Sequence, residues 1–335
     1  MGRARPGDPA LNILRALRAR DPRTIWAVLL IAAFIPGAAS WALTVLIYPI
    51  GLGSHANIYT AAAAAWLSGG DPWTVGPPTA VFAGPPPMLL PYVPFIPLPI
   101  DVTRLFWFAL DLAVAAWALR RLGMPAYWLA FPPLFAAIVL GHVEVLVLGL
   151  LVLRGPLSGL AAVLKPYAVL PLLAERRWFA VVLAAIVLVV SLPILPWARF
   201  LSEAGSISAT LARQNVGDAV FGDPLLMVIA AIALAALGLR RALWLAVPLL
   251  WPYAQPMYKT MTLPVLSPVI AIAWALPFHG ATLAGIVALA GLVTIDRFRP
   301  LPAWLKIGID PVATPSPSGT ALGSQLRPSR AAVPA

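Results

Sequence analysis

The chain has 335 residues, of which 61% are hydrophobic and only 10% are charged, with a net charge of +11. An average soluble domain is about 45–50% apolar and about 25% charged, so this chain is too apolar for a soluble globular domain or for general disorder. A lipid bilayer solvates apolar side chains, and the composition therefore predicts an all-α, polytopic integral membrane protein.

The positive charge does not indicate a nucleic-acid partner. The basic residues lie at the ends of apolar segments, where membrane orientation and contact with anionic lipids explain them. Cysteine is absent, which excludes disulfides and thiolate metal sites. The abundance of Ala, Arg, Gly and Pro is typical of a GC-rich bacterial genome, so we expect a protein of a bacterial plasma membrane.

The chain begins with a basic tail, 1–24, which contains six Arg and precedes an apolar run over 25–50. We interpret this run as a retained signal anchor, because it continues well beyond the small residues at 37–40. Several later apolar stretches are shorter than the roughly 20 residues of a full span. We predict about nine to eleven transmembrane or re-entrant helices in a membrane domain over 25–295. The later stretches are 103–119, 125–140, 142–153, 156–173, 178–198, 225–239, 242–256, 257–277 and 280–295.

Topology is predicted from the distribution of Lys and Arg. Residues 51–102 contain neither, which predicts an extracytoplasmic loop, and 199–224 is predicted to lie on the same side. The N-terminal tail and the C-terminal tail, 296–335, are predicted to be cytoplasmic, and the C-terminal tail is expected to be largely disordered. Three short loops with paired Arg are predicted to be cytoplasmic as well: 120–121, 176–177 and 240–241.

Two regions must then return to the side from which they start. If Arg154 and the pair at 176–177 are both cytoplasmic, residues 156–173 must enter the membrane and come back. Residues 242–295 must supply an even number of crossings, although they contain three apolar stretches. The sequence alone leaves both paths open.

Within the first outer loop, residues 56–67 have a helical composition and are predicted to form a short helix on the membrane surface. A turn at 68–72 is predicted to end this helix. Seven Pro between Pro85 and Pro99 then exclude a regular helix in the following segment.

Ionisable side chains at membrane depth cost about 2.5–3.5 kcal/mol each at a helix centre, so they mark candidate sites. His55, at the outer end of the first span, is either an interfacial side chain or a general base. His142 and Glu144 follow a glycine where a helix is predicted to start, and they either cap that helix or line an outer binding site. Lys165 either snorkels to the interface or, beside the helix break at the next proline, binds a phosphate.

Other polar residues lie in apolar surroundings. Asp111 is expected to have a hydrogen-bond or ion-pair partner, and Gln255, Tyr258 and Lys259 form a second polar group. Arg213 lies among several polar residues of the second outer loop, where such residues are normal. The sequence has no His-Glu-x-x-His zinc pattern and only three His, and we expect neither a metal nor a cofactor.

Short motifs follow one another in a characteristic order. They are Tyr59 with an Ala-rich run at 61–65, Gly69-Gly70-Asp71-Pro72-Trp73, the Pro-rich loop 84–99, Gly141-His142-Val143-Glu144, Lys165-Pro166-Tyr167, Glu175-Arg176-Arg177-Trp178 and Gln214-Asn215. This order resembles the polyprenol-phosphate-mannose-dependent mannosyltransferases, glycosyltransferase family 87 of the GT-C superfamily. The resemblance covers the membrane domain, 25–295.

The resemblance implies a GT-C-like fold. It also implies the transfer of a mannose-like hexose from a polyprenyl-phosphate donor to a lipid or glycan acceptor at the outer face. His55 stands where the family has its catalytic Asp, and it is the candidate base, for which we expect a rate that rises through a pKa near about 6.5. His142 and Glu144 stand where the family has Gln and Asn. The candidate substrate-binding residues are Tyr59, His142, Glu144, Lys165, Arg213, Tyr258 and Lys259.

Two non-enzymatic functions compete with transfer. The departures at the positions of the family's Asp, Gln and Asn are compatible with a catalytically inactive relative. A lipid or solute transporter is the other alternative, and internal repeats would favour it. The two halves of the chain show no convincing repeat.

Overall fold

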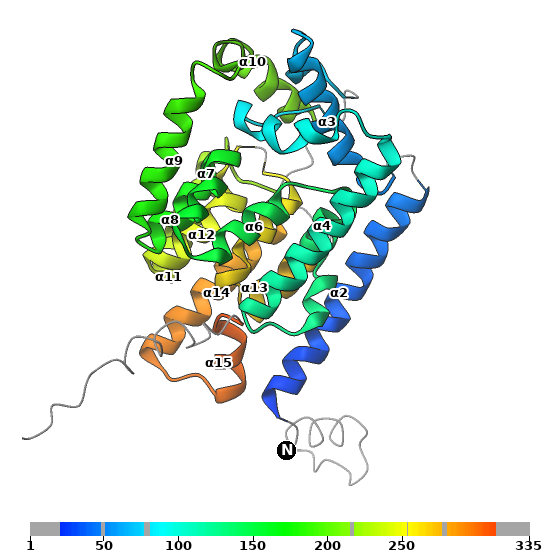
Figure 1. Ribbon diagram of the computed structural model, residues 1–335. Coiled ribbons are helices and arrows are strands. Elements are labelled where there is room, and N and C mark those ends of the chain that lie inside the picture. The colour runs from blue at the N-terminus through cyan, green and yellow to red at the C-terminus, as the bar shows by residue number, and fades with distance from the viewer. Residues whose placement is uncertain are drawn as a thin grey trace, which may run out of the picture.

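The computed structural model describes residues 21–47, 51–76, 81–214, 218–252, 254–276 and 280–312. Every regular element within these ranges is a helix, which confirms the predicted all-α class (Figure 1). Many of the helices are short, because proline and glycine interrupt the apolar stretches at close intervals. The predicted boundaries of the two terminal tails, 1–24 and 296–335, fall partly outside the described residues.

Three described helices are long and apolar enough to cross a membrane: α2 (Pro22–Ile47), α4 (Ile100–Arg121) and α14 (Ala281–Phe298). A fourth candidate is the pair α5 (Pro132–Leu140) and α6 (Glu144–Leu153), which is bent by 112° at its break. Two further apolar helices, α9 (Trp178–Ser191) and α11 (Pro224–Leu237), are shorter. These helices agree with a membrane protein, and the larger number of spans and re-entrant helices stays a prediction.

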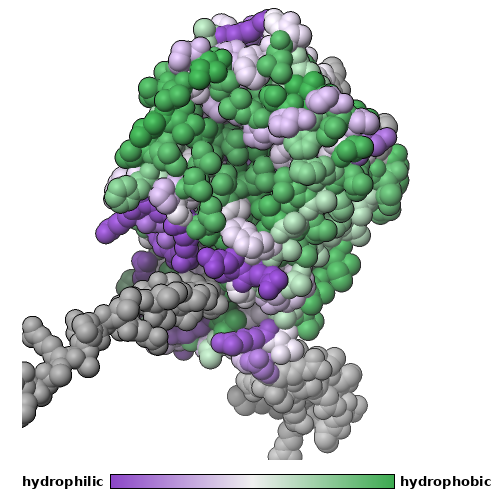
Figure 2. All heavy atoms as spheres, viewed as in Figure 1, coloured by the Kyte–Doolittle hydropathy of each residue, from purple (hydrophilic) through white to green (hydrophobic). Residues whose placement is uncertain are grey.

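The outer surface of the helices is apolar. Large hydrophobic side chains are exposed on several helices, among them Leu46 on α2, Phe179 on α9 and Ile232 on α11. Figure 2 shows apolar residues over most of the visible face. Hydrophilic residues form a band toward the lower end of the view and a smaller group at the upper end. Such a surface is stable where lipid, rather than water, surrounds the helices.

One end of the molecule is rich in arginine. Arg154, Arg177 and Arg240 line one pocket there, although they come from three different parts of the chain. Arg297, at the end of α14, donates a hydrogen bond to the Ala236 carbonyl oxygen at 2.8 Å. The loops that were predicted to share a side are therefore located at one end of the fold, which we call the basic end.

The chain between Arg154 and Arg177 enters the fold and returns to the same end. It does so in four short pieces, and none of them is a full span. They are η4 (Pro156–Gly159), α7 (Leu160–Leu164), η5 (Pro166–Ala168) and α8 (Val169–Ala174). Gly159 allows the closest approach in this region, because a Cβ there would lie 2.1 Å from the Ala180 carbonyl oxygen of α9. The return that the charge distribution required is present.

The region of the second open path, 242–295, is divided into shorter elements than predicted. Residues predicted as one apolar stretch, 257–277, form two elements, η6 (Pro256–Val265) and α13 (Pro268–Ala275). Pro264 lies in the same pocket as Arg240, which begins α12 (Leu239–Leu250), so η6 leads back to the basic end. α13 follows η6, and α14 ends near the basic end, where Arg297 donates to the Ala236 carbonyl oxygen. The number of membrane crossings in this region stays a prediction.

The opposite end contains the two predicted outer loops, and they lie together (Figure 1). The first loop forms α3 (Ser54–Leu67), η1 (Pro72–Thr74) and η2 (Pro86–Phe95). Arg199, in α10 (Trp197–Gln214), pairs with Asp71 at 3.4 Å, and the Phe200 and Trp73 rings are 5.4 Å apart.

Two segments of these loops differ from their predicted form. Part of the Pro-rich segment, Pro86–Phe95, is a 3-10 helix, which begins with prolines in the first turn, where no N–H is needed, and which also contains Pro91 and Pro94. Part of the loop 199–224 is the helix α10, whose polar residues share one side and whose apolar residues share the other.

Orientation in the membrane can be tested with single cysteines, since the chain has none of its own. Ser68 and Ala303 are exposed at opposite ends. We expect Ser68→Cys to react with a membrane-impermeant thiol reagent in intact spheroplasts, and Ala303→Cys to react only after lysis, because the basic end is predicted to be cytoplasmic. The reverse pattern would refute the predicted topology.

Candidate functional site

A group of polar side chains lies in the interior between α3, the bend of α5 and α6, and the segments around 165 and 258. Its members come from four parts of the chain that are far apart in sequence. We call this group the polar cluster, and it consists of His55, Tyr59, His142, Glu144, Lys165, Tyr167 and Tyr258.

The bend between α5 and α6 positions two members of the polar cluster. Gly141 ends α5 in the left-handed conformation with φ 67°, which glycine adopts at no steric cost. A Cβ at Gly141 would lie 3.3 Å from Ala56 of α3, and the Gly53 N–H donates to the Val139 carbonyl oxygen at 2.8 Å. The first turn of α3 therefore docks onto the bend. α6 starts at Glu144, shortly after Gly141, where the sequence predicts the start of a helix.

This docking brings three rings together. The rings of His55 and His142 have centroids 4.9 Å apart, and those of Tyr59 and His142 are 6.1 Å apart. The His55 Nδ1 atom lies 3.4 Å from the Tyr59 hydroxyl oxygen. His142 Nδ1 accepts the Glu144 backbone N–H at 3.4 Å, so His142, rather than the Glu144 carboxylate, satisfies an amide at the start of α6.

His55 is half-buried, and its protonation differs from that of a free imidazole. Burial, and after it the charge of Lys165, lower the pKa of His55 from 6.5 to about 4. The side chain is therefore a neutral base at pH 7. Burial and then the neighbouring Tyr258, Glu144 and Asp111 raise the pKa of Tyr59, so its hydroxyl keeps its proton.

Glu144 and Lys165 form a buried ion pair, with Lys165 Nζ 3.7 Å from Glu144 Oε1. Tyr167 donates a hydrogen bond to the same oxygen. Glu144 Oε2 has no hydrogen-bond partner within the described residues. Lys165 is only 7% exposed and adopts an extended backbone between α7 and η5, so its ammonium is held inside rather than snorkelling to the surface.

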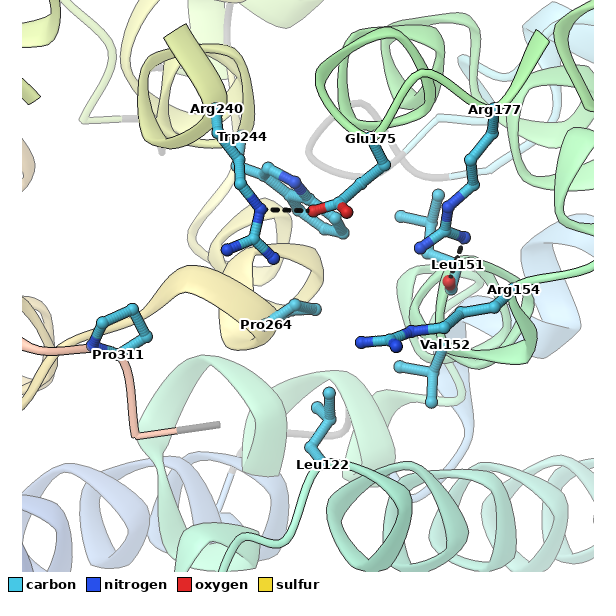
Figure 3. Close-up of a pocket in the computed structure, with 10 residues that line it drawn as sticks. All are labelled: Leu122, Leu151, Val152, Arg154, Glu175, Arg177, Arg240, Trp244, Pro264 and Pro311. Carbon is cyan, nitrogen blue, oxygen red and sulfur yellow. Dashed lines mark hydrogen bonds and ion pairs between the residues drawn. The ribbon is translucent and has the colours of Figure 1, made fainter. Parts of the chain in front are cut away.

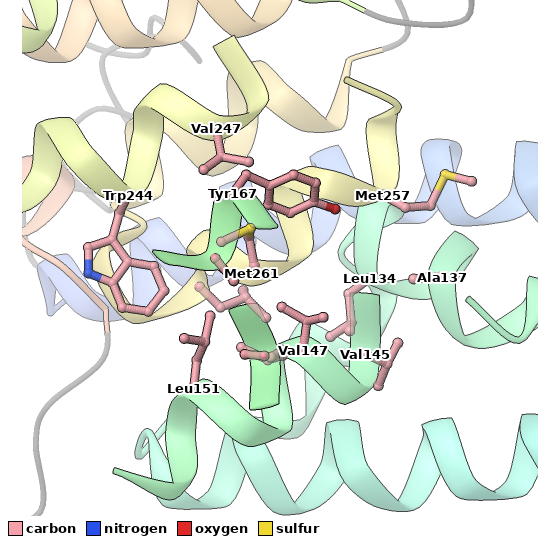
Figure 4. Packing of buried hydrophobic residues seen from close by; sticks show 14 of the residues in the cluster. Leu134, Ala137, Val145, Val147, Leu151, Tyr167, Trp244, Val247, Met257 and Met261 are labelled. Carbon is pink, nitrogen blue, oxygen red and sulfur yellow. The ribbon is translucent and has the colours of Figure 1, made fainter. Parts of the chain in front are cut away.

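Aromatic rings surround the ammonium. Lys165 Nζ lies 5.3 Å from the centroid of the Tyr258 ring and 5.9 Å from that of Tyr167, within the range of cation–π attraction. The two rings are 4.8 Å apart. Tyr167 belongs to the same buried hydrophobic cluster as Val247 and Met261, so the side of the polar cluster next to Tyr167 is apolar (Figure 4).

Two predicted substrate-binding residues are not part of this arrangement. Lys259 pairs with Asp218 at 3.5 Å, and Asp218 also accepts the Thr282 N–H at 2.7 Å, so this pair ties the start of α14 to the segment before α11. Lys259 is thereby occupied in holding helices together. The side chain of Arg213, within α10, lies outside the described residues, and its role stays a prediction.

The structure also revises the interpretation of Asp111. Its carboxylate is fully buried, and within the described residues neither oxygen has a hydrogen-bond partner or an ion pair, so the predicted partner is not found there. Tyr167 is a member of the polar cluster that the sequence does not predict as a site residue, although it directly follows Lys165-Pro166. Among the described residues, no group of three His, Asp or Glu side chains could hold a metal ion.

Comparisons with protein families, with curated proteins and with solved structures find no match for this chain. Its function is therefore argued from the polar cluster itself. The cluster combines a neutral imidazole, a tyrosine hydroxyl and a buried ammonium, which are groups that can accept a proton, donate a hydrogen bond and bind an anion.

Proposed function

We propose that the protein is a membrane glycosyltransferase that transfers a hexose from a polyprenyl-phosphate donor to a lipid or glycan acceptor at the outer face. The observation that carries this proposal is the placement of neutral His55 and buried Lys165 in one cluster, beneath the outer loops. Group transfer from a phosphate carrier needs a proton acceptor and a cation, and these two residues supply both.

In the proposed reaction, the acceptor hydroxyl oxygen attacks the anomeric carbon of the donor sugar. The bond between that carbon and the phosphate oxygen breaks, and its electron pair leaves with the polyprenyl phosphate. The hydroxyl proton passes to His55. If His55 Nδ1–H donates to the Tyr59 oxygen, then Nε2 carries the free lone pair that accepts this proton.

Lys165 is the candidate partner for the leaving phosphate. Its ammonium is buried, so its interaction with a phosphate oxygen is stronger than it would be in water. Glu144 neutralises the ammonium in the absence of donor, and the unpartnered Oε2 atom leaves Glu144 able to accept a hydrogen bond from a sugar hydroxyl. Donor binding then replaces one anionic partner of Lys165 with another.

The carboxylate of Asp71 does not compete with His55 as a candidate base. Asp71 accepts the Trp73 N–H at 2.9 Å and pairs with Arg199, so it shapes the turn at the end of α3. Glu144 is the carboxylate that belongs to the polar cluster, and it is the alternative proton acceptor. A carboxylate also provides the negative charge that stabilises a cationic sugar, which imidazole lacks.

The test is direct transfer by the purified protein in liposomes. Polyprenyl phosphates that carry radiolabelled mannose, glucose or galactose are supplied with a lipid extract of the source membrane as acceptor. We expect label to move from one donor to a new lipid or glycan product. Donor binding without transfer in any extract would instead identify a non-catalytic relative, and no binding of any donor would refute the proposal.

A further inference from the structure

A pocket of about 240 Å³ opens at the basic end, away from the polar cluster. It lies between the ends of α4, α6 and α8 and the start of α12, and Figure 3 shows the side chains that line it. Three of them are arginines, Arg154, Arg177 and Arg240, and one is an acid, Glu175. The charge of the lining is therefore positive by two.

The three guanidinium groups are not equally engaged. Arg240 Nε pairs with Glu175 Oε1 at 2.7 Å, and Arg177 Nη1 donates to the Leu151 carbonyl oxygen at 2.6 Å. Arg154 has no hydrogen bond or ion pair within the described residues. In Figure 3 the Arg154 guanidinium and the terminal nitrogens of Arg240 point into the space between them.

The arginines are close enough to repel one another. Burial lowers the pKa of Arg177, Glu175 raises it, and Arg154 and Arg240 lower it again. The single carboxylate therefore leaves repulsion that a bound anion would relieve. Guanidinium groups bind phosphate oxygens with paired N–H donors, which makes phosphate a suitable anion.

Trp244 forms one wall of the pocket and is only 1% exposed. Its indole Nε1 atom is fully buried, so a ligand in the pocket does not reach it. The polar donors that the pocket offers are therefore its arginines, beside apolar side chains.

We propose that this pocket binds a phosphate-bearing anion through the guanidinium groups of Arg154 and Arg240. The phosphate belongs either to the headgroup of an anionic lipid or to a soluble phosphate compound. Both sources are available at a basic membrane surface, where anionic headgroups accumulate beside Lys and Arg. This site is separate from the polar cluster and does not depend on glycosyl transfer.

The test measures binding to the full-length protein, purified in a neutral detergent, with no reference to transferase activity. The probes are inorganic phosphate, short-chain phosphatidylglycerol and short-chain phosphatidylcholine as the zwitterionic control. We expect the wild-type protein to bind one of the first two. Binding of phosphatidylglycerol alone assigns a lipid headgroup, and competition by inorganic phosphate assigns a soluble phosphate compound.

Variants then locate the site. We expect Arg154→Gln to raise the dissociation constant about tenfold, which corresponds to about 1.4 kcal/mol. Arg240→Gln removes the second guanidinium, and we expect it to raise the dissociation constant about fivefold. Arg299→Gln is the matched control, since Arg299 is exposed in the same part of the molecule but does not line the pocket.

The proposal is overturned if the wild-type protein binds neither phosphate probe. It is also overturned if Arg154→Gln binds as well as Arg299→Gln. Elution volume and melting temperature are measured for every variant. Because Arg154 and Arg240 are both exposed, their replacement is expected to leave the fold intact.

Discussion

Replacing Lys165 with methionine is expected to destabilise the protein by about 3–5 kcal/mol, because Glu144 would remain buried without its counter-charge. The cost comes from the ion pair at 3.7 Å and from the aromatic rings around the ammonium. Yield and melting temperature should both fall. A loss of activity in this single variant would therefore not distinguish donor binding from folding.

The double variant Lys165→Met with Glu144→Gln separates the two roles. It removes both charges, so we expect most of the stability to return, with Tyr167 donating to the glutamine oxygen in place of the carboxylate. The matched control is Glu144→Gln alone, which keeps the ammonium. We expect the double variant to bind a polyprenyl-phosphate donor at least about tenfold more weakly than this control. Equal binding by the two variants would exclude Lys165 as the phosphate partner.

Replacing His55 with alanine is expected to lower the rate of transfer by roughly 10²–10⁴-fold, the usual contribution of a general base. His55 is half-buried at the start of α3, so folding should be little affected. Ser54→Ala is the control, because Ser54 precedes His55 in the same helix and lies outside the polar cluster. His55→Asp supplies the residue of the resembled family and should be more active than His55→Ala. Full activity of His55→Ala would show that another group, with Glu144 first, accepts the proton.

The pH dependence of the same assay tests the environment of His55. Because its pKa in the folded protein is lowered to about 4, the base form persists at every pH above that value. We expect the wild-type rate to stay level through pH 6.5 and to fall only as pH approaches 4. An inflection near pH 6.5 would instead indicate an imidazole in contact with water. Folding stability should decrease as pH falls from about 6.5 toward 4, since only the unfolded chain binds the proton there.

Local features of the fold follow from the sequence where a single residue type decides the backbone. Gly141 ends one helix and the next starts shortly after it, as the glycine predicts. Pro166 interrupts the helix beside Lys165. The paired arginines lie at the same end of the fold, as their positions between apolar stretches predict. In each case the backbone or the position is decided by one property: the conformational freedom of glycine, the missing N–H of proline, or the preference of positive charge for one membrane surface.

The contacts within the polar cluster could not be predicted in this way. Glu144 contacts Lys165 and Tyr167 because the short elements between α6 and α9 fold back toward α6. Elements of that length are too short for the hydropathy pattern to predict. The ion pair between Lys259 and Asp218 joins two segments that are distant in sequence, so the sequence pattern does not predict it. Likewise the pKa of His55 depends on burial by the α5–α6 bend, which composition does not reveal.

The pieces between Arg154 and Arg177 are four elements of three to six residues each, and in a chain inserted as predicted they would reach the translocon in this form. None approaches the roughly 20 residues that leave laterally as a helix, and their backbone polar groups are satisfied in lipid only against neighbouring helices. Because η4 and α7 contact α9, which is made after them, we expect this region to insert after translation of α9. The ammonium of Lys165 would then enter the bilayer already paired with the Glu144 carboxylate. The chain would not have to move an unpaired charge into lipid.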